Sequence, residues 1–369
     1  MLRHFDQHGG GVRTYTTQLL PALFAVAQNQ HFVLLFRNPR LLGTYAAYSQ
    51  VTEIHVPGSS VLAWDQWHVP AAARRLGIDV LFNPKYSIPL NARCSTAWVC
   101  HGLDWYIMPW GSAWLDRMSH RFLVPRYARK ADAIITVSDI TRQHVIEFLK
   151  VPAERVHTVY SAIASVFRTS PSEDEMIQVR RRHALPAKFL LYVGQIYPPK
   201  NFTRLVQAYA RVGPARGIPL VIAGGTPSIL SRHELAVPER LGISEWVHWP
   251  GWLTAEELAC VYRLATALLL PSLFESFGFP ILEAMAAGCP VLTANRYGTQ
   301  EIAADAALLV DPEQLEDIAT GIARLVEDDV LRSQLIGRGR ARADQFTMER
   351  CAAQTYAVLN GLAPGNSAR

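Results

Sequence analysis

Residues 267–288 read ALLLPSLFESFGFPILEAMAAG. The apolar run that opens this stretch predicts a buried strand, and a loop follows it as far as Phe279. Proline is favoured at the first position of a helix, so Pro280 predicts that a helix begins there. The loop carries Glu275, and the first helical turn is expected to carry Glu283. A strand, a loop and a helix in this order form the repeating unit of an α/β fold with a parallel sheet.

The two glutamates lie where open parallel sheets bind their ligands, because the loops after the strands line a crevice at the carboxyl edge. The amino end of the following helix also presents N–H groups and a partial positive charge, which suit a phosphate. We therefore predict a ligand site around Glu275, Gly278 and Glu283. The alternative is that one glutamate offsets the helix dipole and the other is a solvated loop residue.

Length and composition predict a cytoplasmic globular protein of two domains. The chain has 369 residues, of which 50% are hydrophobic and 18% are charged. Its five cysteines show no metal-ligand spacing, and their odd number argues against a disulfide framework, as expected in a reducing compartment. No apolar run reaches the roughly 18 residues that a spanning helix needs, and we identify no signal peptide.

Basic residues are concentrated in the first half of the chain. Residues 1–168 contain 17 Lys and Arg against 10 Asp and Glu, whereas residues 169–369 contain 19 against 21. The asymmetry predicts an anionic partner, such as a membrane surface or an acidic glycan. Residues 116–130 combine charge with aromatic residues, and their alternative interpretation is a solvated helix face. The basic residues expected to meet a membrane are Arg117, Arg121, Arg126, Arg129 and Lys130. No nucleic-acid recognition motif accompanies the charge, so nucleic acid is not an expected partner.

A glycine loop stands in HGGGVRTYTTQLLPAL, residues 8–23. Gly10 and Gly11 allow the backbone to approach an anion or a sugar closely, and a helix is expected over residues 12–27. As a dinucleotide fingerprint the motif is incomplete, because Thr14 stands at the third glycine position. The alternative is a tight turn without a ligand. Only MLRHF precedes the loop, so we expect the first strand to be short or the start of the chain to have been assigned late.

Strands and helices are predicted to alternate along the first half, which implies right-handed βαβ units and a parallel sheet. The expected strands are residues 31–36, 51–56, 79–83, 95–100, 133–137 and 156–163. Helices are expected over residues 64–76 and 138–150, the second with Ser138 as its N-cap. His101 directly follows a predicted strand and therefore lies at the carboxyl edge, as either a functional or a structural residue.

A second alternation begins at residue 189, after a polar stretch that we interpret as the domain boundary. Its expected strands are residues 189–194, 220–225, 246–251, 267–270 and 290–294, and the last helices are expected over residues 312–327, 330–345 and 347–362. Lys200 follows the first of these strands in GQIYPPKNF, where a point charge suits a diphosphate. The alternative is a surface lysine. Asn201 is expected to cap the next helix.

Taken together, these motifs resemble the retaining, nucleotide-sugar-dependent glycosyltransferases of the GT-B fold, of the family-four type (glycosyl transferases group 1). The resemblance covers nearly the whole chain. It includes the glycine loop, a histidine loop in HGLDWYIMP and a phosphate-binding loop in LYVGQIYPPKNFTRLVQAY. The most specific signature is PSLFESFGFPILEAMAAGCPV with GTQEIAADAALLVDP, in which Glu275 and Glu283 have the Glu-x7-Glu spacing.

The resemblance implies two Rossmann-like, doubly wound parallel-sheet domains that face each other across a cleft. Residues 1–165 would bind the acceptor, and residues 166–345 would bind the nucleotide sugar. Residues 346–369 would form a helix that crosses back to the first domain.

The resemblance also implies roles for individual residues. Lys200 would neutralise the diphosphate, Glu275 would contact donor-sugar hydroxyls, Glu283 would bind the ribose hydroxyls, and His101 would lie near the transferred sugar. His101, Glu275 and Lys200 are thus the expected catalytic residues. The other expected donor-binding residues are Gly10, Gly11, Gln195, Phe277, Gly278, Phe279 and Glu301. Many relatives have arginine where this chain has Gln195, so one cationic phosphate contact is missing or supplied elsewhere.

The activity implied is transfer of a hexose, with retention, from a nucleotide diphosphate sugar to a glycan or lipid-linked acceptor in surface polysaccharide synthesis. The loop variant resembles mannosyltransferases and favours GDP-mannose, with a UDP-sugar as the alternative donor. No cofactor is expected, and no metal, because the chain has no Asp-x-Asp motif. Peripheral contact with the inner face of the cytoplasmic membrane is a further expectation.

Other functions remain open. They are a sugar-nucleotide epimerase or a phosphorylase of the same fold, a dinucleotide-dependent oxidoreductase, and a non-catalytic nucleotide-sugar-binding protein. The incomplete glycine fingerprint disfavours the oxidoreductase, and no motif supports the Schiff-base lysine of a pyridoxal-type phosphorylase.

Overall fold

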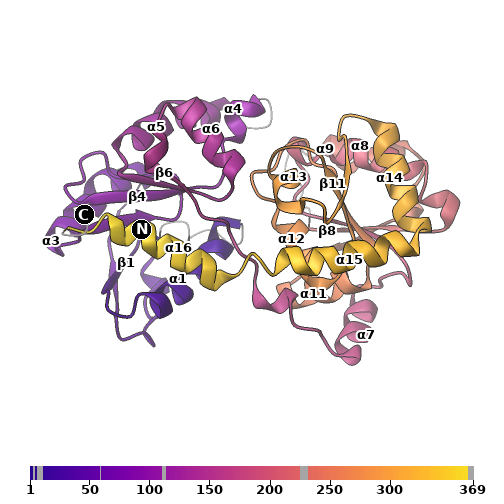
Figure 1. Ribbon diagram of the computed structural model, residues 1–369, viewed down its shortest axis with the longest axis horizontal. Helices are drawn as coiled ribbons and strands as arrows, with labels where there is room; N and C mark the ends of the chain where they lie inside the picture. Colours follow the sequence, from indigo (N-terminus) through magenta and orange to yellow (C-terminus); the bar gives the residue numbers. More distant parts are fainter. Residues whose placement is uncertain (3–4, 6–10, 59, 110–113, 225–231, 365–369) are drawn as a thin grey trace. The chain divides into compact units, whose positions relative to one another are not determined.

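The computed structural model describes residues 1–2, 5, 11–58, 60–109, 114–224 and 232–364 (Figure 1). The chain divides into two compact units. Unit 1 comprises Met1–Ala162 with Thr347–Arg369, and unit 2 comprises Ile163–Phe346. Every strand pair that the described residues form is parallel, which confirms the predicted α/β class.

Unit 2 contains a six-stranded sheet, counted over its described residues, with the order β12-β11-β10-β7-β8-β9. The strands are β7 (Leu190–Val193), β8 (Leu220–Ala223), β9 (Val247–Gly251), β10 (Ala267–Leu270), β11 (Val291–Ala294) and β12 (Leu308–Val310). All residues of β7, β8, β10 and β11 are buried, as expected for a parallel sheet covered by helices on both faces. The first strand of the unit, β7, is therefore central, and the chain winds outward from it in both directions.

The sheet of unit 2 is accompanied by helices, some of which begin with capping residues. The helices are α7 (Glu173–Arg182), α8 (Phe202–Ala210), α9 (Arg232–Leu235), α10 (Val237–Arg240), α11 (Ala255–Leu264), α12 (Phe279–Ala287), α13 (Tyr297–Ala303), α14 (Leu315–Glu327) and α15 (Asp329–Ala343). A capping box of Ser172 and Glu175 opens α7, and one of Thr254 and Glu257 opens α11.

The described residues of unit 1 form two sheets. One pairs β1 (Phe32–Phe36) with β2 (Val51–His55), and the other has the order β3-β4-β5-β6. The strands of the second sheet are β3 (Val80–Asn83), β4 (Ser95–Cys100), β5 (Ala133–Thr136) and β6 (Val156–Thr158). The helices are α1 (Gly11–Val26), α2 (Val61–Ala63), α3 (Val69–Arg75), α4 (Asp104–Ile107), α5 (Trp114–Lys130), α6 (Asp139–Leu149) and α16 (Met348–Gly361). Figure 1 shows α16 in yellow beside α1, and these two helices pack together.

The predicted helix over residues 64–76 is wrong in detail, because a π-helical segment, Trp64–His68, separates α2 from α3. The N–H of Val69 donates to the carbonyl of Trp64, five residues earlier. Pro70 follows directly and has no N–H to continue an α-helical ladder. A π turn next to a proline accommodates that missing donor.

Three other predictions differ from the structure. The strand predicted at 156–163 ends at Thr158, and β12 was not predicted as a strand. Glu283 lies in the second turn of α12, because the helix begins at Phe279 and has no acidic residue in its first turn. Ser138, by contrast, caps α6 as predicted, by accepting a hydrogen bond from the N–H of Thr141.

Candidate functional site

The candidate site lies where the winding of unit 2 reverses. From β7 the chain moves to β8 and β9 on one side, and then returns to β10 on the other. Open α/β sheets bind ligands at the carboxyl ends of the two strands that flank such a point. The loops after β7 and β10 meet there, since the N–H groups of Leu273 and Phe274 both donate to the carbonyl of Pro199, at 2.8 and 3.3 Å.

Lys200 ends a short 3₁₀ helix, Pro198–Lys200, in the loop after β7. The residue is 8% exposed, and its ammonium forms an ion pair with the carboxylate of Glu275. Burial by itself lowers the pKa of Lys200, but the charge of Glu275, with Tyr197 and Glu283 nearby, more than offsets this and raises the pKa above its usual value. Lys200 is therefore a fixed positive charge at the centre of the site and not a surface lysine.

Glu275 belongs to the loop after β10 and shares its Oε1 between two donors. Besides Lys200, the hydroxyl of Ser272 donates to it at 3.1 Å. The backbone carbonyl of Glu275 accepts from the N–H of Gly298 at 3.0 Å. A solvated loop glutamate would have no such contacts, so the structure contradicts that interpretation.

Gly278 is required by the backbone at the start of α12. Its φ is 95°, in the region that glycine adopts without strain, and it is the N-cap residue of the helix. A Cβ at this position would lie 2.9 Å from Cδ1 of Ile281. The rings of Phe277 and Phe279 pack against each other with centroids 5.0 Å apart, which fixes the entry into α12.

Glu283 lies on α12 and is held by Tyr262 of α11, whose hydroxyl donates to its Oε2 at 2.9 Å. Removal from water raises the pKa of Glu283 to about 7, although the hydrogen bond from Tyr262 and the charge of Lys200 act in the opposite direction. The predicted pair of carboxylates therefore differs in environment, since Glu275 contacts Lys200 directly and Glu283 contacts a neutral phenol.

Ionisation of Glu283 is expected to lower the free energy of unfolding as pH rises from about 4.5 to about 7. The native carboxyl keeps its proton up to about 7, whereas the unfolded chain releases it near the usual value of 4.5. The stabilisation is therefore complete below the unfolded pKa and is lost as pH rises through the folded one, at about 1.4 kcal/mol per unit of pKa difference. Urea unfolding across this range should show a steeper decline for the wild type than for Glu283→Gln. Parallel pH profiles for the two proteins would contradict the assignment.

Asn201 connects its own loop, after β7, to two other loops at the carboxyl edge of the sheet. Its Nδ2 donates to the carbonyl of Pro271, after β10, at 2.9 Å and to that of Pro312, after β12, at 2.7 Å. Its φ is 59°, a left-handed conformation that asparagine tolerates better than most residues. The predicted capping role is wrong, because the side chain makes no capping bond to α8 although the residue is at the N-cap position.

Replacing Asn201 with alanine is expected to destabilise unit 2 by about 2–4 kcal/mol, because the buried carbonyl of Pro271 loses this donor and that of Pro312 keeps only Arg204. Alanine also tolerates a left-handed backbone less well than asparagine does. Denaturant unfolding measures this change. Asn201→Gly is the matched control, since it removes the same amide but relieves the backbone strain. An alanine variant as stable as the wild type would show that the two hydrogen bonds of Asn201 do not stabilise unit 2.

The remaining predicted residues of unit 2 lie around these loops. Gln195 is exposed, and its carbonyl accepts from the hydroxyl of Tyr192 at 3.0 Å. Glu301 lies on α13, and its carbonyl accepts from Arg342 at 2.8 Å. Gly298, at the start of α13, lies so close to the loop after β10 that a Cβ would be 2.5 Å from the carbonyl oxygen of Ser276. The amino end of α13 thus supports the loop that carries Glu275.

Two predicted residues belong to unit 1. His101 follows β4, as expected, and its Nε2 lies 2.8 Å from the carbonyl of Pro84. Burial lowers the pKa of His101 to about 4, so the imidazole is neutral at physiological pH. Its ring packs edge-on against Tyr15 at 5.0 Å. Gly11 is the first residue of α1, and Gly10 lies outside the described residues.

Two residues of the site were not identified from the sequence, Tyr262 and Ser272. Tyr262 is 21 positions from Glu283, and Ser272 is three positions from Glu275. Within the described part of the chain, no group of three His, Cys, Asp or Glu side chains is arranged to hold a metal ion. None of the helices formed by the described residues is long and apolar enough to cross a membrane.

Comparison with known proteins identifies both halves of the chain. Residues 9–165 match the family model Glycosyltransferase Family 4, and residues 174–342 match the model Glycosyl transferases group 1. Among relatives, O-antigen chain mannosyltransferase B of Escherichia coli is 33% identical over 233 residues, which cover 61% of this chain and 59% of that protein. Serotype-specific mannosyltransferase WbdA of the same species is 29% identical over 223 residues, which cover 59% of this chain and 27% of WbdA. The chain thus matches less than two thirds of the length of either relative.

A solved structure supports the same fold. The structure of HepE from Anabaena in complex with UDP and glucose has a TM-score of 0.74 at 17% identity, covering 96% of this chain and 98% of that one. At this identity the likeness concerns the fold alone. Together with the two family models and the parallel-sheet units, it shows that this chain is a member of the group 1 glycosyltransferases of the GT-B fold.

Proposed function

We propose that the protein transfers a hexose, with retention of configuration and without a metal, from a nucleotide diphosphate sugar to a glycan or lipid-linked acceptor in surface polysaccharide synthesis. The observation that carries the proposal is the pairing of Lys200 with Glu275 at the switch point of unit 2. A cation and a carboxylate held there together match the two ends of such a donor, a diphosphate and a sugar with free hydroxyls.

In this proposal, Lys200 receives the negative charge that develops on the leaving diphosphate. A cation that is already positioned and largely removed from water stabilises such charge far more effectively than one in solution. The amino end of α12, which begins at Phe279 after Gly278, adds backbone N–H groups and a partial positive charge. The exposed Gln195 adds no charge, so Lys200 carries this role without the arginine found in many relatives.

Glu275 would accept hydrogen bonds from hydroxyls of the donor sugar, and Glu283 from those of the ribose. The transition state of glycosyl transfer has oxocarbenium character, which nearby carboxylates stabilise. The neutral imidazole of His101 would lie near the transferred sugar, and Gly10 and Gly11 near the phosphates. Departure and attack on the same face of the sugar would give retention without a covalent intermediate.

Mannose is the proposed sugar and GDP-mannose the proposed donor. Both relatives described above are named as mannosyltransferases. The structure of HepE was solved with UDP and glucose, so a UDP-sugar is the competing donor class. These two donors differ in base and in sugar, and a direct assay separates them.

A thermal-shift screen with GDP, UDP, ADP, dTDP and their sugar conjugates tests the proposal. A ligand that binds only the folded state raises the melting temperature. The expected result is a shift with GDP-mannose that exceeds the shift with any UDP-sugar. Product analysis by NMR with the best donor should then show the anomeric configuration of the donor retained. Donor turnover without an acceptor, beyond slow hydrolysis, would favour an epimerase, and the absence of any shift would favour a function without nucleotide sugars.

The basic face of α5 supports contact with an anionic membrane. Arg121, Arg126 and Arg129 are exposed, and Phe122 is 62% exposed with the guanidinium of Arg126 lying 4.2 Å from its ring centroid. Aromatic and basic side chains on one helix face suit a headgroup region. The side chain of Arg117 lies outside the described residues.

Binding to vesicles that contain an anionic lipid is expected to weaken as salt rises, because charges at a membrane surface act within a Debye length. Sedimentation with vesicles between low and high salt measures this binding. The variant Arg126→Glu should bind about tenfold more weakly, since each basic residue contributes about 1 kcal/mol and reversal removes at least that. Arg40→Glu, an exposed change of equal charge elsewhere in unit 1, is the control. Equal loss in both variants, or binding that ignores salt, would argue against this face.

A further inference from the structure

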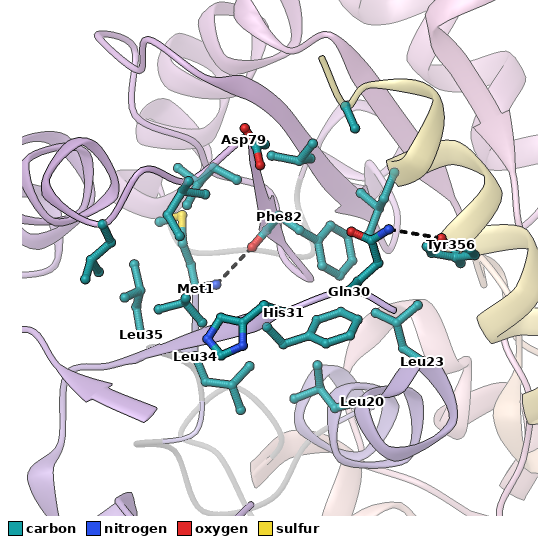
Figure 2. Close-up of a pocket in the computed structure, with 18 of the residues that line it drawn as sticks. Met1, Leu20, Leu23, Gln30, His31, Leu34, Leu35, Asp79, Phe82 and Tyr356 are labelled. Atoms are coloured by element: carbon teal, nitrogen blue, oxygen red, sulfur yellow. Dashed lines mark hydrogen bonds between the residues drawn. The ribbon is translucent and has the colours of Figure 1, made fainter. Parts of the chain in front are cut away.

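Two cavities in the described part of the chain differ in the side chains that line them. The cavity in unit 1, of about 290 Å³, is lined largely by apolar residues, and Figure 2 shows Leu20 and Leu23 among them. A second cavity, of about 360 Å³, is formed entirely by residues of unit 2. None of the described residues that line this second cavity is acidic, and four are basic: Lys188, Arg216, Arg263 and Arg332. We call it the basic cavity.

The basic cavity lies at the amino edge of the sheet of unit 2. Lys188 stands just before β7, and the lining residues 216–218 and 264–266 stand just before β8 and β10. The candidate donor site lies at the other edge, in the loops that follow β7 and β10. A parallel strand rises about 3.3 Å per residue, so the four residues of β10 separate the two edges by about 13 Å. The basic cavity is therefore distinct from the site of Lys200 and Glu275.

Two helices complete the wall of the cavity. Val326, near the end of α14, and Arg332 and Ile336, on α15, line it, and both helices are labelled in Figure 1. One guanidinium nitrogen of Arg332, Nη1, donates to the carbonyls of Leu325 and Val326 at 2.7 and 3.0 Å. These bonds fix the position of the guanidinium at the carboxyl end of α14. The cavity thus brings together groups from strand ends and from two helices.

Two of the four basic side chains already have carboxylate partners. Arg216 forms an ion pair with Glu327 at 2.5 Å, and Arg332 forms one with Asp329. The side chains of Glu327 and Asp329 are 58% and 87% exposed, and neither lines the cavity. Such exposed pairs are weak, and a guanidinium has five N–H donors, more than one carboxylate can use. Both arginines can therefore bind a further anion on the cavity side.

The other two basic side chains have no carboxylate partner. Among the described residues, neither Lys188 nor Arg263 forms an ion pair. The guanidinium of Arg263 is held by the carbonyls of Ala259 and Phe167, to which it donates at 3.2 and 3.3 Å. Burial lowers the pKa of Arg263, and the nearby charge of Arg340 acts in the same direction, although Cys260 opposes them. Positive charges that repel one another in this way would be stabilised by an anion between them.

The chemistry of the lining indicates the class of anion. Guanidinium groups bind phosphate oxygens through two parallel N–H donors, and a lysine adds a compact point charge. The volume lies in the range of sites for small organic molecules, so the cavity has room for more than a single phosphate group. The uncharged residues of the lining are mostly small or apolar and leave the basic groups as its main polar feature.

We propose that the basic cavity binds a soluble small molecule that carries at least two phosphate groups. Lys188, Arg216, Arg263 and Arg332 bind these groups, and the ligand joins the amino edge of the sheet to α14 and α15. The inference does not rest on the proposed transfer reaction, because the donor site lies at the opposite edge of the sheet.

Inorganic pyrophosphate is the probe that tests this proposal, with sodium chloride at equal ionic strength as the reference. Pyrophosphate also resembles the diphosphate of the proposed donor, so each measurement is repeated in Lys200→Met, which lacks the cation of that site. We expect pyrophosphate to raise the melting temperature of both proteins by about 2 °C or more. Hydrogen exchange in residues 216–218 and 264–266 should slow in both proteins, because the ligand stabilises these turns.

Lys188→Gln is the decisive variant, because Lys188 is exposed and forms no ion pair among the described residues, so its removal leaves the fold intact. Isothermal titration should show about tenfold weaker binding of pyrophosphate, since one hydrogen bond to a charged group is lost. Arg263→Gln should weaken binding further, but it also loses the bond to Phe167. Arg324→Gln is the matched control, an exposed residue of α14 that does not line the cavity, and its affinity should change by less than about twofold.

Three results would overturn the proposal. The first is the absence of pyrophosphate binding in Lys200→Met, which would place all binding at the donor site. The second is equal affinity in Lys188→Gln and the wild type, and the third is an equal loss in Lys188→Gln and Arg324→Gln, which would indicate general attraction to a basic surface. Binding to vesicles that contain phosphatidic acid, lost in Lys188→Gln, without any binding of pyrophosphate would replace the soluble ligand with a lipid headgroup.

Discussion

Glu275→Gln is expected to remain folded, although less stable than the wild type because it leaves the ammonium of Lys200 without its partner, and to reduce the rate of glycosyl transfer by about a thousandfold. The amide keeps the shape of the side chain and its bond to Ser272, but it removes the negative charge beside Lys200. Loss of one positioned group that acts on developing charge costs about 10²–10³ in rate, and the proposed contacts to the sugar are lost in addition. Steady-state kinetics should show the loss in kcat, with little change in KM for the donor.

The control for this experiment is Ser272→Ala, which removes the second donor to Glu275 and leaves the carboxylate in place. Its activity should fall by less than about tenfold. Circular dichroism and thermal unfolding establish that both variants are folded. Near wild-type turnover by Glu275→Gln would exclude Glu275 from the catalytic residues.

Lys200→Met is expected to weaken binding of the nucleotide diphosphate by about 10- to 100-fold. A hydrogen bond to a charged group contributes about 1.5–3 kcal/mol, and each 1.4 kcal/mol is a factor of ten in the dissociation constant. The substitution also leaves the partly buried carboxylate of Glu275 without its cation, so the variant should be less stable than the wild type. Isothermal titration with the preferred nucleotide measures the affinity.

Lys200→Arg is the matched control, because it keeps the charge but places it on a larger, planar group. It should retain more affinity than the methionine variant. The double variant Lys200→Met, Glu275→Gln should recover part of the lost stability, since neither charge is then left alone. Unchanged nucleotide affinity in Lys200→Met would remove this residue from the site.

Much of unit 2 is predictable because its signals are local. Residues 267–288 place the strand, the loop and the helix in one contiguous stretch, and the structure has β10, the loop and α12 in that order. Gly278 has the positive φ that only a glycine adopts without strain. In unit 1, the predicted cap Ser138 likewise acts on an N–H group only three positions later.

The contacts that assemble the site are not predictable in this way, because they join distant parts of the chain. Lys200 and Glu275 are 75 positions apart, and Asn201 reaches Pro312 across 111 positions. The position of Glu283 in the second turn depends on where α12 begins, and element boundaries are set by tertiary contacts as much as by propensity.

The start of unit 1 illustrates the same limit. The residues before the glycine loop are a poor strand, and this much can be read from composition. The place of Met1 and Leu2 between β1 and β3 follows only from hydrogen bonds that cross 81 and 33 positions.

The ion pair of Lys200 and Glu275 has a consequence for selectivity. The ammonium and the carboxylate neutralise each other, so a ligand that separates them must offer a new partner to each. An inorganic anion would bind the ammonium of Lys200 but leave the carboxylate of Glu275 without a partner in a poorly hydrated position. A free sugar would bind the carboxylate but leave the ammonium without a partner. A molecule that offers an anion and hydroxyl groups on one frame compensates both. If the protein has the proposed function, the pair would therefore favour a ligand that carries both an anion and hydroxyl groups over inorganic phosphate or a free sugar.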